Sequence, residues 1–506
     1  MPLTNHDMAE PYVVEVTPMG SPEAAPSARS ARSMLVLSDV HLGSDIGDGS
    51  LTRAPTRSQR VDDDLAALLD HYREARIDDE PWDLVINGDF IDFVGIALDP
   101  SRAVLSTEPT AEERAHGLGT AEDHACVKLA RTAERHPGVF ASLAAFVGAG
   151  HHLVIVPGNH DREFHWDKVK SDLRALLFGA FELANETKGS ADDFFARIRF
   201  SSWFYWVEGV AYIEHGHQYD SFCATDHVMA PVSPLDHRRL LPGFSDVLLR
   251  FVVHPTPAIR QCNHDRMGVL AYLSLAARLG LRGGIDLVSR FVSAIVELFR
   301  LRRISLSAAA ATLRIEHERL VAHFAEVMRI DLRRLRALLA LQARPVTRSI
   351  RGIMASVLLD ELALALLSVA AFCALAILGF HRPSFVWVGA LVIPGWWLVH
   401  RLLSRRRHVD PQTELAARAA SLARLFPAAF VVMGHTHVPV CAVVEEGGAT
   451  YVNTGSWAED DGVHPDASFA HRAARTHLVI RVRDTGPEAE LLAWDSTAGP
   501  RRFATD

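Results

Sequence analysis

The sequence of 506 residues predicts an α/β fold in which polar side chains gather at one edge of a β-sheet. From residue 34 to about residue 220, apolar runs typical of strands alternate with stretches of helical spacing, such as residues 61–76 and 122–135, which indicates βαβ units. Five apolar runs are each followed by a short segment rich in Asp, His and Asn. Uninterrupted β-branched runs are typical of strands buried on both faces. Because α/β proteins bind ligands at the carboxyl ends of such strands, the five segments are expected to meet at one rim.

The first strand is expected at Met34-Leu35-Val36-Leu37, and the next three at the apolar runs before Gly88, Gly158 and His215. The fifth run, residues 430–433, comes much later, so residues 221–425 are interpreted as an insertion into the catalytic domain. Closing strands are expected at residues 450–453, 477–482 and 488–494. The five polar segments are Asp39-Val40-His41, Gly88-Asp89-Phe90-Ile91-Asp92, Gly158-Asn159-His160-Asp161, His215-Gly216-His217 and Gly434-His435-Thr436-His437.

The side chains of these segments offer oxygen and nitrogen donors for metal ions. Asp39 and His41 are two positions apart and are expected on the same side of an extended chain. Asp89 can bridge two cations, and Asn159 supplies an amide oxygen. The set suits Mn, Fe, Zn or Co, with Mn expected, and it is large enough for two divalent ions about 3.5–4 Å apart. Imidazole nitrogens come from His435, His437 and His215, for which His217 is an alternative.

A metal pair of this kind indicates phosphoester hydrolysis, because it binds a phosphoryl oxygen and lowers the pKa of a bridging water. His160, next to Asn159, is expected to protonate the leaving group as the general acid. Asp161 is expected to be catalytic together with His160, whereas Asp92 is expected to lie just outside the metal ligands. Either carboxylate can fix an imidazole tautomer. Arg162 either contacts a substrate phosphate or forms a surface ion pair.

Composition excludes some classes of partner. The net charge of −9 and the lack of a basic stretch interleaved with aromatic residues predict no nucleic-acid partner. The five cysteines are scattered, which fits a reducing compartment and leaves thiols out of the metal site. Residues 1–32 are rich in Pro, Ala and Ser without a long apolar core, which predicts a disordered leader rather than a secretory signal.

Two apolar runs late in the chain indicate a transmembrane helical hairpin over residues 357–403. Residues 362–380 form an uncharged run close to the roughly 20 residues that span a bilayer. A second run, residues 384–399, carries tryptophans suited to the membrane interface. Arginines precede the first run and follow the second, so both ends are expected in the cytoplasm. The alternative is a buried helical hairpin in a soluble oligomer.

The rest of the insertion is expected to be mainly helical. Apolar residues from Leu287 to Phe299 recur at helical spacing, with Arg290 and Arg300 among the polar positions. Beside a membrane hairpin, such a helix either lies in the headgroup region or packs on the catalytic domain or on a second subunit.

Taken in order, the five segments resemble the pattern of the calcineurin-like metallophosphoesterase superfamily, which is D-x-H, GDxxD, GNHD, a His before Gly, and GHxH. The resemblance covers residues 33–220 and 426–495 and implies a four-layer α/β sandwich with two metals. It implies Asp39, His41, Asp89 and His437 as ligands of one metal. For the other it implies Asp89, Asn159, His215 and His435, with His215 favoured over His217 because it precedes Gly. The run from His215 to Asp220 resembles UDP-2,3-diacylglucosamine pyrophosphatases, which typically carry Arg at the position of His160.

These observations predict a membrane-anchored, dinuclear metal-dependent phosphoesterase that hydrolyses a phosphoester or pyrophosphate, which the hairpin suggests is lipid-linked. The alternatives are a soluble substrate such as a cyclic nucleotide, and a non-catalytic scaffold. The expected location is a membrane, the bacterial inner membrane, with the catalytic domain in the cytoplasm; the oligomeric state is left open. The predicted domains are a leader (1–32), the catalytic domain (33–220 and 426–495), the insertion (221–425) and a tail (496–506).

Overall fold

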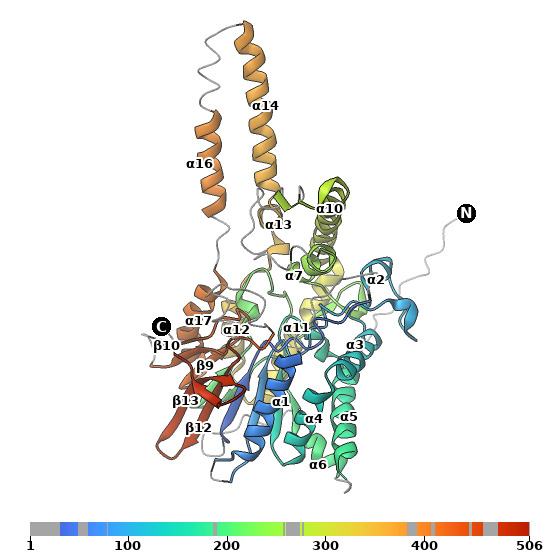
Figure 1. Cartoon of the computed structure of the whole chain (residues 1–506). Coiled ribbons are helices and arrows are strands. Elements are labelled where there is room, and N and C mark those ends of the chain that lie inside the picture. Colours follow the sequence, from blue (N-terminus) through green and yellow to red (C-terminus); the bar gives the residue numbers. More distant parts are fainter. Residues whose placement is uncertain are drawn as a thin grey trace, which may run out of the picture.

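The computed structural model describes residues 31–48, 59–77, 79–185, 190–256, 259, 274–275, 278–381, 392–405, 410–444, 448–458 and 474–504. The body of the molecule contains two large β-sheets, and a pair of helices projects from it (Figure 1). This pair consists of α14 (Leu359–His381) and α16 (Val392–Arg405). Residues 1–30 of the predicted leader and the first half of the second apolar run, residues 384–391, lie outside the described residues.

The larger sheet has seven strands in the order β14-β13-β12-β1-β2-β3-β4, of which β1 to β4 run parallel. The predicted first strand is confirmed as β1, and the predicted closing strands at residues 477–482 and 488–494 lie within β12 and β13, with β12 antiparallel to β1. The strands are β1 (Met34–Leu37), β2 (Asp83–Asn87), β3 (His152–Val156), β4 (Ile198–Phe200), β12 (Thr476–Arg483), β13 (Gly486–Asp495) and β14 (Gly499–Arg502).

The helices between these strands cover the outer face of the larger sheet. Leu35 and Leu37 of β1 pack in one cluster with residues of α1, α3, α4 and α5, whereas Met34 and Val36 point to the opposite side. This burial on both faces explains why β1 has no polar alternation. The helices of this region are α1 (Gln59–Glu74), α2 (Ala111–His116), α3 (Glu122–Arg135), α4 (Pro137–Gly148), α5 (Asp167–Ala184) and α6 (Ala191–Ala196).

The smaller sheet has the order β10-β11-β9-β6-β5 and packs face to face on the larger one. Met34 and Val36 of β1 share an apolar cluster with Ile213 of β6 and Val432 of β9. Strands β6 and β9 are parallel neighbours although most of the insertion separates them in sequence. The strands are β5 (Tyr205–Val207), β6 (Ala211–Ile213), β9 (Phe430–Met433), β10 (Val440–Val443) and β11 (Thr450–Asn453).

Helices α11 (Ala308–Met328), α12 (Leu332–Leu341) and α17 (Pro411–Leu425) cover the outer face of the smaller sheet. Val321, Leu335 and Leu415, one from each helix, share a cluster with the strand residues Tyr212 and Val431. The layers are therefore helix, sheet, sheet and helix, a mixed α/β fold of the kind that the sequence predicts. Part of the segment 221–425 thus completes this sandwich, because the smaller sheet buries its outer face against it.

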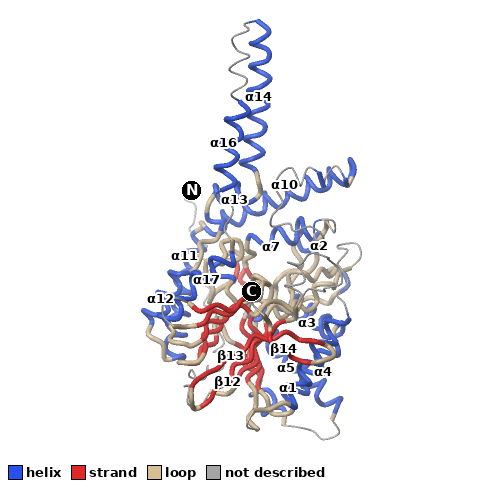
Figure 2. Tube along the Cα trace, turned by 60° about the vertical axis from the view of Figure 1, so that its left-hand side comes forward, coloured by secondary structure: helices blue, strands red, loops and turns tan. Residues whose placement is uncertain are grey.

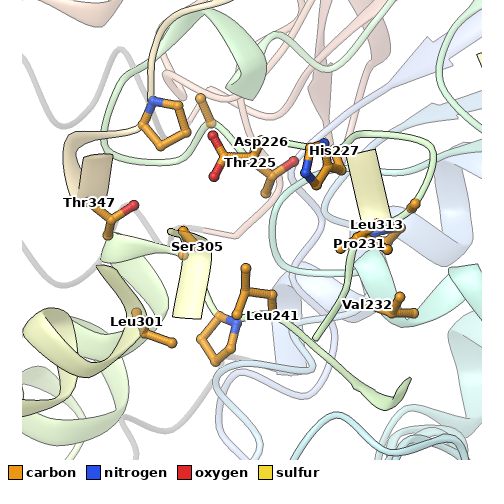
Figure 3. Close-up of a pocket in the computed structure, with 15 residues that line it drawn as sticks. Thr225, Asp226, His227, Pro231, Val232, Leu241, Leu301, Ser305, Leu313 and Thr347 are labelled. Atoms are coloured by element: carbon orange, nitrogen blue, oxygen red, sulfur yellow. The ribbon is translucent and has the colours of Figure 1, made fainter. Parts of the chain in front are cut away.

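The remainder of that segment forms a separate cluster at the base of the projecting helices. It contains the hairpin β7 (Val232–Ser233) and β8 (Asp236–Leu240), then α7 (Phe244–Leu248), a π-helical stretch (Leu249–Val253), α10 (Gly280–Ser305) and α13 (Ile350–Ser356). Phe244, Leu298 and Ile353 pack together in its core. A pocket in this region contains none of the predicted metal ligands (Figure 3). It is lined by residues 224–227, 230–232 and 241–243, by Leu301, Ser305 and Leu313 of α10 and α11, and by Pro345 and Thr347.

Among the described residues, one helix is long and apolar enough to cross a membrane. Leu359–Ile377 of α14 has a mean hydropathy of 2.0, and 6% of this stretch is buried. Helices α14 and α16 lie side by side in both views (Figures 1 and 2), and His400 Nδ1 is 3.3 Å from Glu361 Oε1 near their base. The described chain therefore leaves the apolar surface of α14 exposed, and the alternative of a helical hairpin buried in an oligomer stays a prediction.

Candidate metal centre

The polar segments after β1 and β2 are joined by their backbones. Asp39 N donates to Gly88 O at 3.1 Å, and His41 N donates to Asp89 O at 2.8 Å. Asp39, His41 and Asp89 have φ values of 53°, 49° and 52°, in the left-handed region that residues other than glycine seldom adopt. His435 and His437 share this feature, with φ values of 69° and 58°. The extended conformation that was predicted for Asp39 and His41 is therefore wrong. The strained, left-handed backbone at these residues sets the direction of their side chains.

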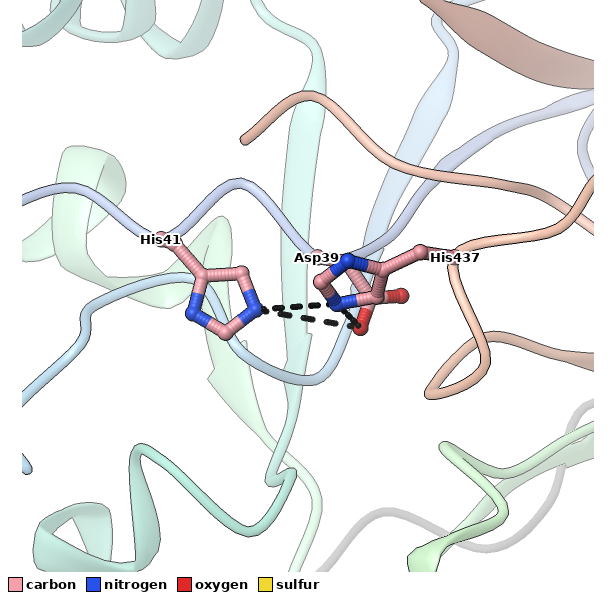
Figure 4. Close-up of side chains that lie close together, drawn as sticks. All are labelled: Asp39, His41 and His437. Atoms are coloured by element: carbon pink, nitrogen blue, oxygen red, sulfur yellow. Dashed lines mark hydrogen bonds and ion pairs between the residues drawn. The ribbon is translucent and has the colours of Figure 1, made fainter. Parts of the chain in front are cut away.

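Asp39, His41 and His437 form a first group of metal-binding type (Figure 4). His437 Nε2 lies 3.1 Å from Asp39 Oδ1 and 3.3 Å from His41 Nε2. Asp39 Oδ1 and His41 Nε2 are 3.9 Å apart. The three donors converge on one point from segments that begin and end the catalytic domain. Two imidazole nitrogens facing each other beside a carboxylate are the donor set that a divalent cation of the Mn, Fe, Zn or Co type prefers.

Asp39, Asp89 and His215 form a second group, which shares Asp39 with the first. His215 Nε2 is 3.3 Å from Asp89 Oδ2 and 3.9 Å from Asp39 Oδ1. His215 Nδ1 donates to Asn87 O at 2.9 Å, which leaves the lone pair on Nε2. Burial of the ring opposes protonation, yet the two carboxylates raise the pKa of His215 to about 9. The negative charge of these two carboxylates, which favours a protonated His215, would also favour a bound metal cation.

His217 lies beside His215, with the ring centroids 5.5 Å apart, but among the described residues it is His215 that joins Asp39 and Asp89 in a group of metal-binding type. Gly216 adopts a left-handed conformation with φ 103°, and His217 begins a short 3-10 helix (His217–Tyr219) instead of continuing the strand. Its Nε2 lies 3.0 Å from Gln218 Nε2. The geometry therefore favours His215, the residue before Gly.

Asn159 is placed to offer its amide oxygen. Its side chain is buried, and in the part of the chain that the structure describes Asn159 Oδ1 has no hydrogen-bond partner. The adjacent residue His160 donates its backbone N–H to Asp89 Oδ1 at 2.8 Å. A buried amide oxygen without a partner costs free energy unless a donor or a cation satisfies it. Asn159 therefore fits a ligand of a metal ion.

His435 is brought to the same rim but contacts a residue that sequence reasoning did not select. Strand pairing places it there, because Gly434 N donates to His215 O at 3.0 Å. Its ring Nε2 is 3.1 Å from Asp220 Oδ2, and the two residues form a further group of metal-binding type with Cys223. The signal for Asp220 was present in the sequence, since this residue ends the run that starts at His215.

The imidazole of His160 is held by Asp92. Nδ1 of His160 lies 2.7 Å from Asp92 Oδ1, which also accepts from Gly95 N at 2.8 Å. Burial opposes protonation, but the carboxylates of Asp92 and Asp89 raise the pKa of His160 to about 10. Burial likewise opposes ionisation of Asp92, yet His160, His41 and His254 hold its pKa well below the usual range. His254, at the end of the π-helical stretch, thus contributes to the lowered pKa of Asp92.

Asp161 is occupied by two backbone amides. It accepts from Gly158 N at 2.6 Å and from Phe90 N at 2.8 Å, and its side chain is fully buried. Burial, reinforced by the Asp89 carboxylate, raises the pKa of Asp161 to about 7. Of the two carboxylates considered for the His160 ring, Asp92 makes the contact, whereas Asp161 ties two loops of the site together.

Two glycines of the segments are required by close approach. A Cβ on Gly158 would overlap the carboxylate of Asp89, and a Cβ on Gly434 would overlap the carboxylate of Asp39. These positions explain why glycine precedes a ligand in two of the segments: the ligand loops pass too close together for any side chain.

Arg162 connects the catalytic loop to the insertion. Its guanidinium pairs with Asp246, its Nη1 donates to Leu241 O at 3.1 Å, and its Nε donates to Asn159 O at 3.3 Å. The arginine side chain is 10% exposed and that of Asp246 is 7% exposed. Arg162 thus forms an ion pair, as one of the two predicted roles requires, but the pair is largely buried and not on the surface.

We expect Arg162→Ala to loosen the segment 241–246, because Asp246 would remain buried without its partner, at a cost of up to about 3–5 kcal/mol. Hydrogen exchange at Gly243, whose N–H donates to Asp246 at 2.7 Å, should accelerate. The matched control is Arg238→Ala, which removes a largely exposed arginine that pairs with Asp236 nearby. Equal exchange in both variants would show that Arg162 does not hold the segment.

Two packed sheets with clustered carboxylates and imidazoles at their strand ends define a class, the metal-dependent hydrolases of mixed α/β fold. Residues 33–288 match the family described as calcineurin-like phosphoesterase, and the chain belongs to this family. It is accordingly a metal-dependent phosphoester hydrolase. The matched range contains four of the five segments, and strand β9 brings in the fifth. No curated protein matches the chain, and the narrower resemblance to UDP-2,3-diacylglucosamine pyrophosphatases stays a prediction.

Proposed function

We propose that this protein is a membrane-anchored, dinuclear phosphoesterase that hydrolyses a lipid-linked phosphoester or pyrophosphate at the cytoplasmic face of the membrane. The observation that carries the proposal is α14, whose apolar surface is exposed and whose base joins the part of the insertion that contacts the metal rim.

The donors of the rim fit two divalent ions. Asp39, His41, Asp89 and His437 would hold one, and Asp89, Asn159, His215 and His435 the other. The buried Asn159 oxygen and the inward-facing His215 Nε2, neither of which has a hydrogen-bond partner among the described residues, are the atoms that most need such an ion. Ions of this type, when bound, polarise a phosphoryl oxygen and activate water; Mn is the ion that we expect.

His160 supplies the proton for the leaving group. Asp92 accepts from Nδ1, which leaves Nε2 as the nitrogen that faces a ligand. The carboxylates of Asp92 and Asp89 favour the protonated form of the ring, which is the form that a general acid needs. The Asp161 carboxylate accepts from Phe90 N, and the Asp89 carboxylate accepts from His160 N. These hydrogen bonds hold the two loops at a fixed spacing, so that His160 stays next to the metal ligands.

The projecting helices have the dimensions of a membrane anchor. Helix α14 has 23 residues, about 35 Å at 1.5 Å per residue, compared with a hydrocarbon core of about 30 Å. Arg344, Arg348 and Arg351 lie before it, and Arg401 and Arg405 lie in the last turns of α16. Basic residues at both ends of the pair favour a cytoplasmic position for the body.

The first part of the insertion lies over the metal rim and favours a substrate that arrives from the membrane side. Arg162 contacts Leu241 and Asp246 of this part, and Phe244 beside them packs in one cluster with Val357 at the base of the anchor. These contacts support a link between the loop that carries His160 and the base of the anchor. A lipid-linked substrate would meet this surface before it reaches the ligands.

The test removes the anchor and compares two substrates. Replacing residues 362–398 with a short Gly/Ser linker is feasible because Glu361 and His400 are already in contact. We expect kcat/KM for a lipid phosphoester in vesicles to fall by at least about 10²-fold, through loss of the high local concentration of substrate, while that for bis-p-nitrophenyl phosphate is retained.

The full chain in the same vesicles is the control, and circular dichroism verifies that the shortened chain is folded. Equal losses on both substrates would contradict the lipid assignment. Preferential hydrolysis of a cyclic nucleotide by the full chain would favour the soluble-substrate alternative.

A further inference from the structure

Helix α10 exposes a row of apolar side chains on the side that faces away from the body. Five residues spaced along one face are between 54% and 84% exposed, although they are the residue types that cores normally contain. They are Leu281, Ile285, Val288, Val292 and Val296, here called the α10 stripe.

The opposite side of α10 is already occupied. Leu287, Ala294, Leu298 and Leu301 are buried in the cluster that contains α7 and α13. At 3.6 residues per turn, these positions lie across the helix from the α10 stripe. Packing on the catalytic body therefore accounts for one face of α10 and leaves the other without a partner in the described chain.

The position of α10 identifies what can cover the stripe. Helix α10 lies crosswise to α14 at the base of the projecting pair (Figure 2). Val357 and Leu359, which connect α13 to α14, pack in the same cluster as the buried face of α10. The stripe is therefore near the end of a second exposed apolar surface, that of α14, in which Leu362, Leu366 and Val369 are exposed.

The charge of α10 favours a lipid surface with anionic headgroups. The helix contains five arginines and two acidic residues. Arg282, Arg300 and Arg303 are exposed. A basic helix with an apolar face that lies in the plane of the membrane surface has this composition. A contact with a second copy of the chain would not need this excess of positive charge.

We propose that α10 lies on the bilayer surface, with the α10 stripe in the boundary between headgroups and acyl chains. The proposal rests on the membrane anchoring by α14. Helix α10 then supplies a second attachment, which stops the body from rotating about the hairpin and holds the region over the metal rim against the membrane. This attachment defines the substrate class further, as a phosphoester whose phosphorus lies close to the bilayer surface.

The test measures the depth of side chains in vesicles of phosphatidylcholine and phosphatidylglycerol that contain the full chain. Single cysteines, introduced after replacement of the five native ones, carry a nitroxide spin label at Val288, Val292 or Val296. Collision of the label with oxygen and with a water-soluble nickel chelate is compared at each position. We expect loss of nickel accessibility and high oxygen accessibility at the stripe, and the reverse at Ser289 and Ser293, which are exposed on α10 outside the stripe.

A label at Val369 of α14 reports on the anchor independently, and circular dichroism verifies that each labelled chain is folded. Nickel accessibility at the stripe with a shielded Val369 would overturn the α10 proposal and leave the anchor intact. Nickel accessibility at Val369 would overturn the membrane anchoring itself. Shielding of the stripe from both probes, with spin–spin broadening, would show a second copy of the chain in place of the lipid.

Discussion

Asp89→Asn is expected to lower kcat by about 10³-fold or more and to remove bound metal. Asp89 is 2% exposed; its Oδ2 lies 3.5 Å from His41 Nε2 and 3.3 Å from His215 Nε2, so it adjoins both groups of ligands. The amide replaces one carboxylate oxygen by an NH₂ group, which cannot bind a cation, while it keeps the shape of the side chain. Loss of several kcal/mol of charge stabilisation corresponds to this decrease in rate.

The measurement combines steady-state kinetics with metal analysis of the purified variant. Asp172→Asn on α5 is the matched control, because it makes the same chemical change at a carboxylate that pairs with Lys168 and belongs to none of the ligand groups among the described residues. We expect normal metal content and normal activity in the control. Full metal content and near-normal activity in Asp89→Asn would contradict the assignment of Asp89 as the shared ligand.

His160→Ala is expected to lower kcat by about 10²–10⁴-fold without loss of metal. The imidazole contacts Asp92 at 2.7 Å and is 16% exposed at its side chain, as an acid that faces a substrate should be. Because an alkoxide needs a proton and p-nitrophenolate does not, the loss should be large for an alkyl phosphoester and small for a p-nitrophenyl ester. The two kcat values and the metal content are measured on the same preparation.

Asp92→Asn should reproduce this dependence on the leaving group with a smaller loss, about 10–100-fold, since Asp92 acts by holding the imidazole. The companion variant Asp161→Asn tests the other carboxylate, which accepts from two backbone amides and makes no contact with the ring. An equal loss for alkyl and p-nitrophenyl esters in His160→Ala would show that the residue does not protonate the leaving group.

The convergence of the metal ligands could be predicted from sequence because it follows from strand parallelism. The apolar runs before Asp39, Asp89 and Asn159 become β1, β2 and β3, three adjacent parallel strands whose carboxyl ends meet at one edge. The runs before His215 and His435 become β6 and β9, which pair in parallel in the smaller sheet. The single sheet that the sequence predicted is therefore wrong, and the packing of the two sheets is what brings all five segments to one rim.

The partners of individual side chains could not be predicted in this way. Whether Asp92 or Asp161 holds His160 depends on side-chain directions within two loops, and the contact of His435 with Asp220 joins residues that are far apart in sequence. The left-handed backbone at Asp39, His41 and Asp89 is equally invisible in sequence, because no glycine marks these positions. It is maintained by hydrogen bonds between loops.

The insertion shows the same division. Hydropathy alone identified α14, yet α11, α12 and α17 pack on the smaller sheet although they lie within residues 221–425. The apolar pattern of α10 also predicted a helix but left its partner open. In the structure one face of α10 packs on the body and the α10 stripe stays exposed.

The strands, the order of the ligand segments, the donor chemistry and the apolar helix could be predicted from residue types and their short-range spacing. The folded chain was needed to show which carboxylate holds the acid, that Asp220 joins the rim, that Arg162 connects the rim to the insertion, and which face of α10 is left for a partner. These features depend on contacts between segments distant in sequence, and local patterns do not encode such contacts.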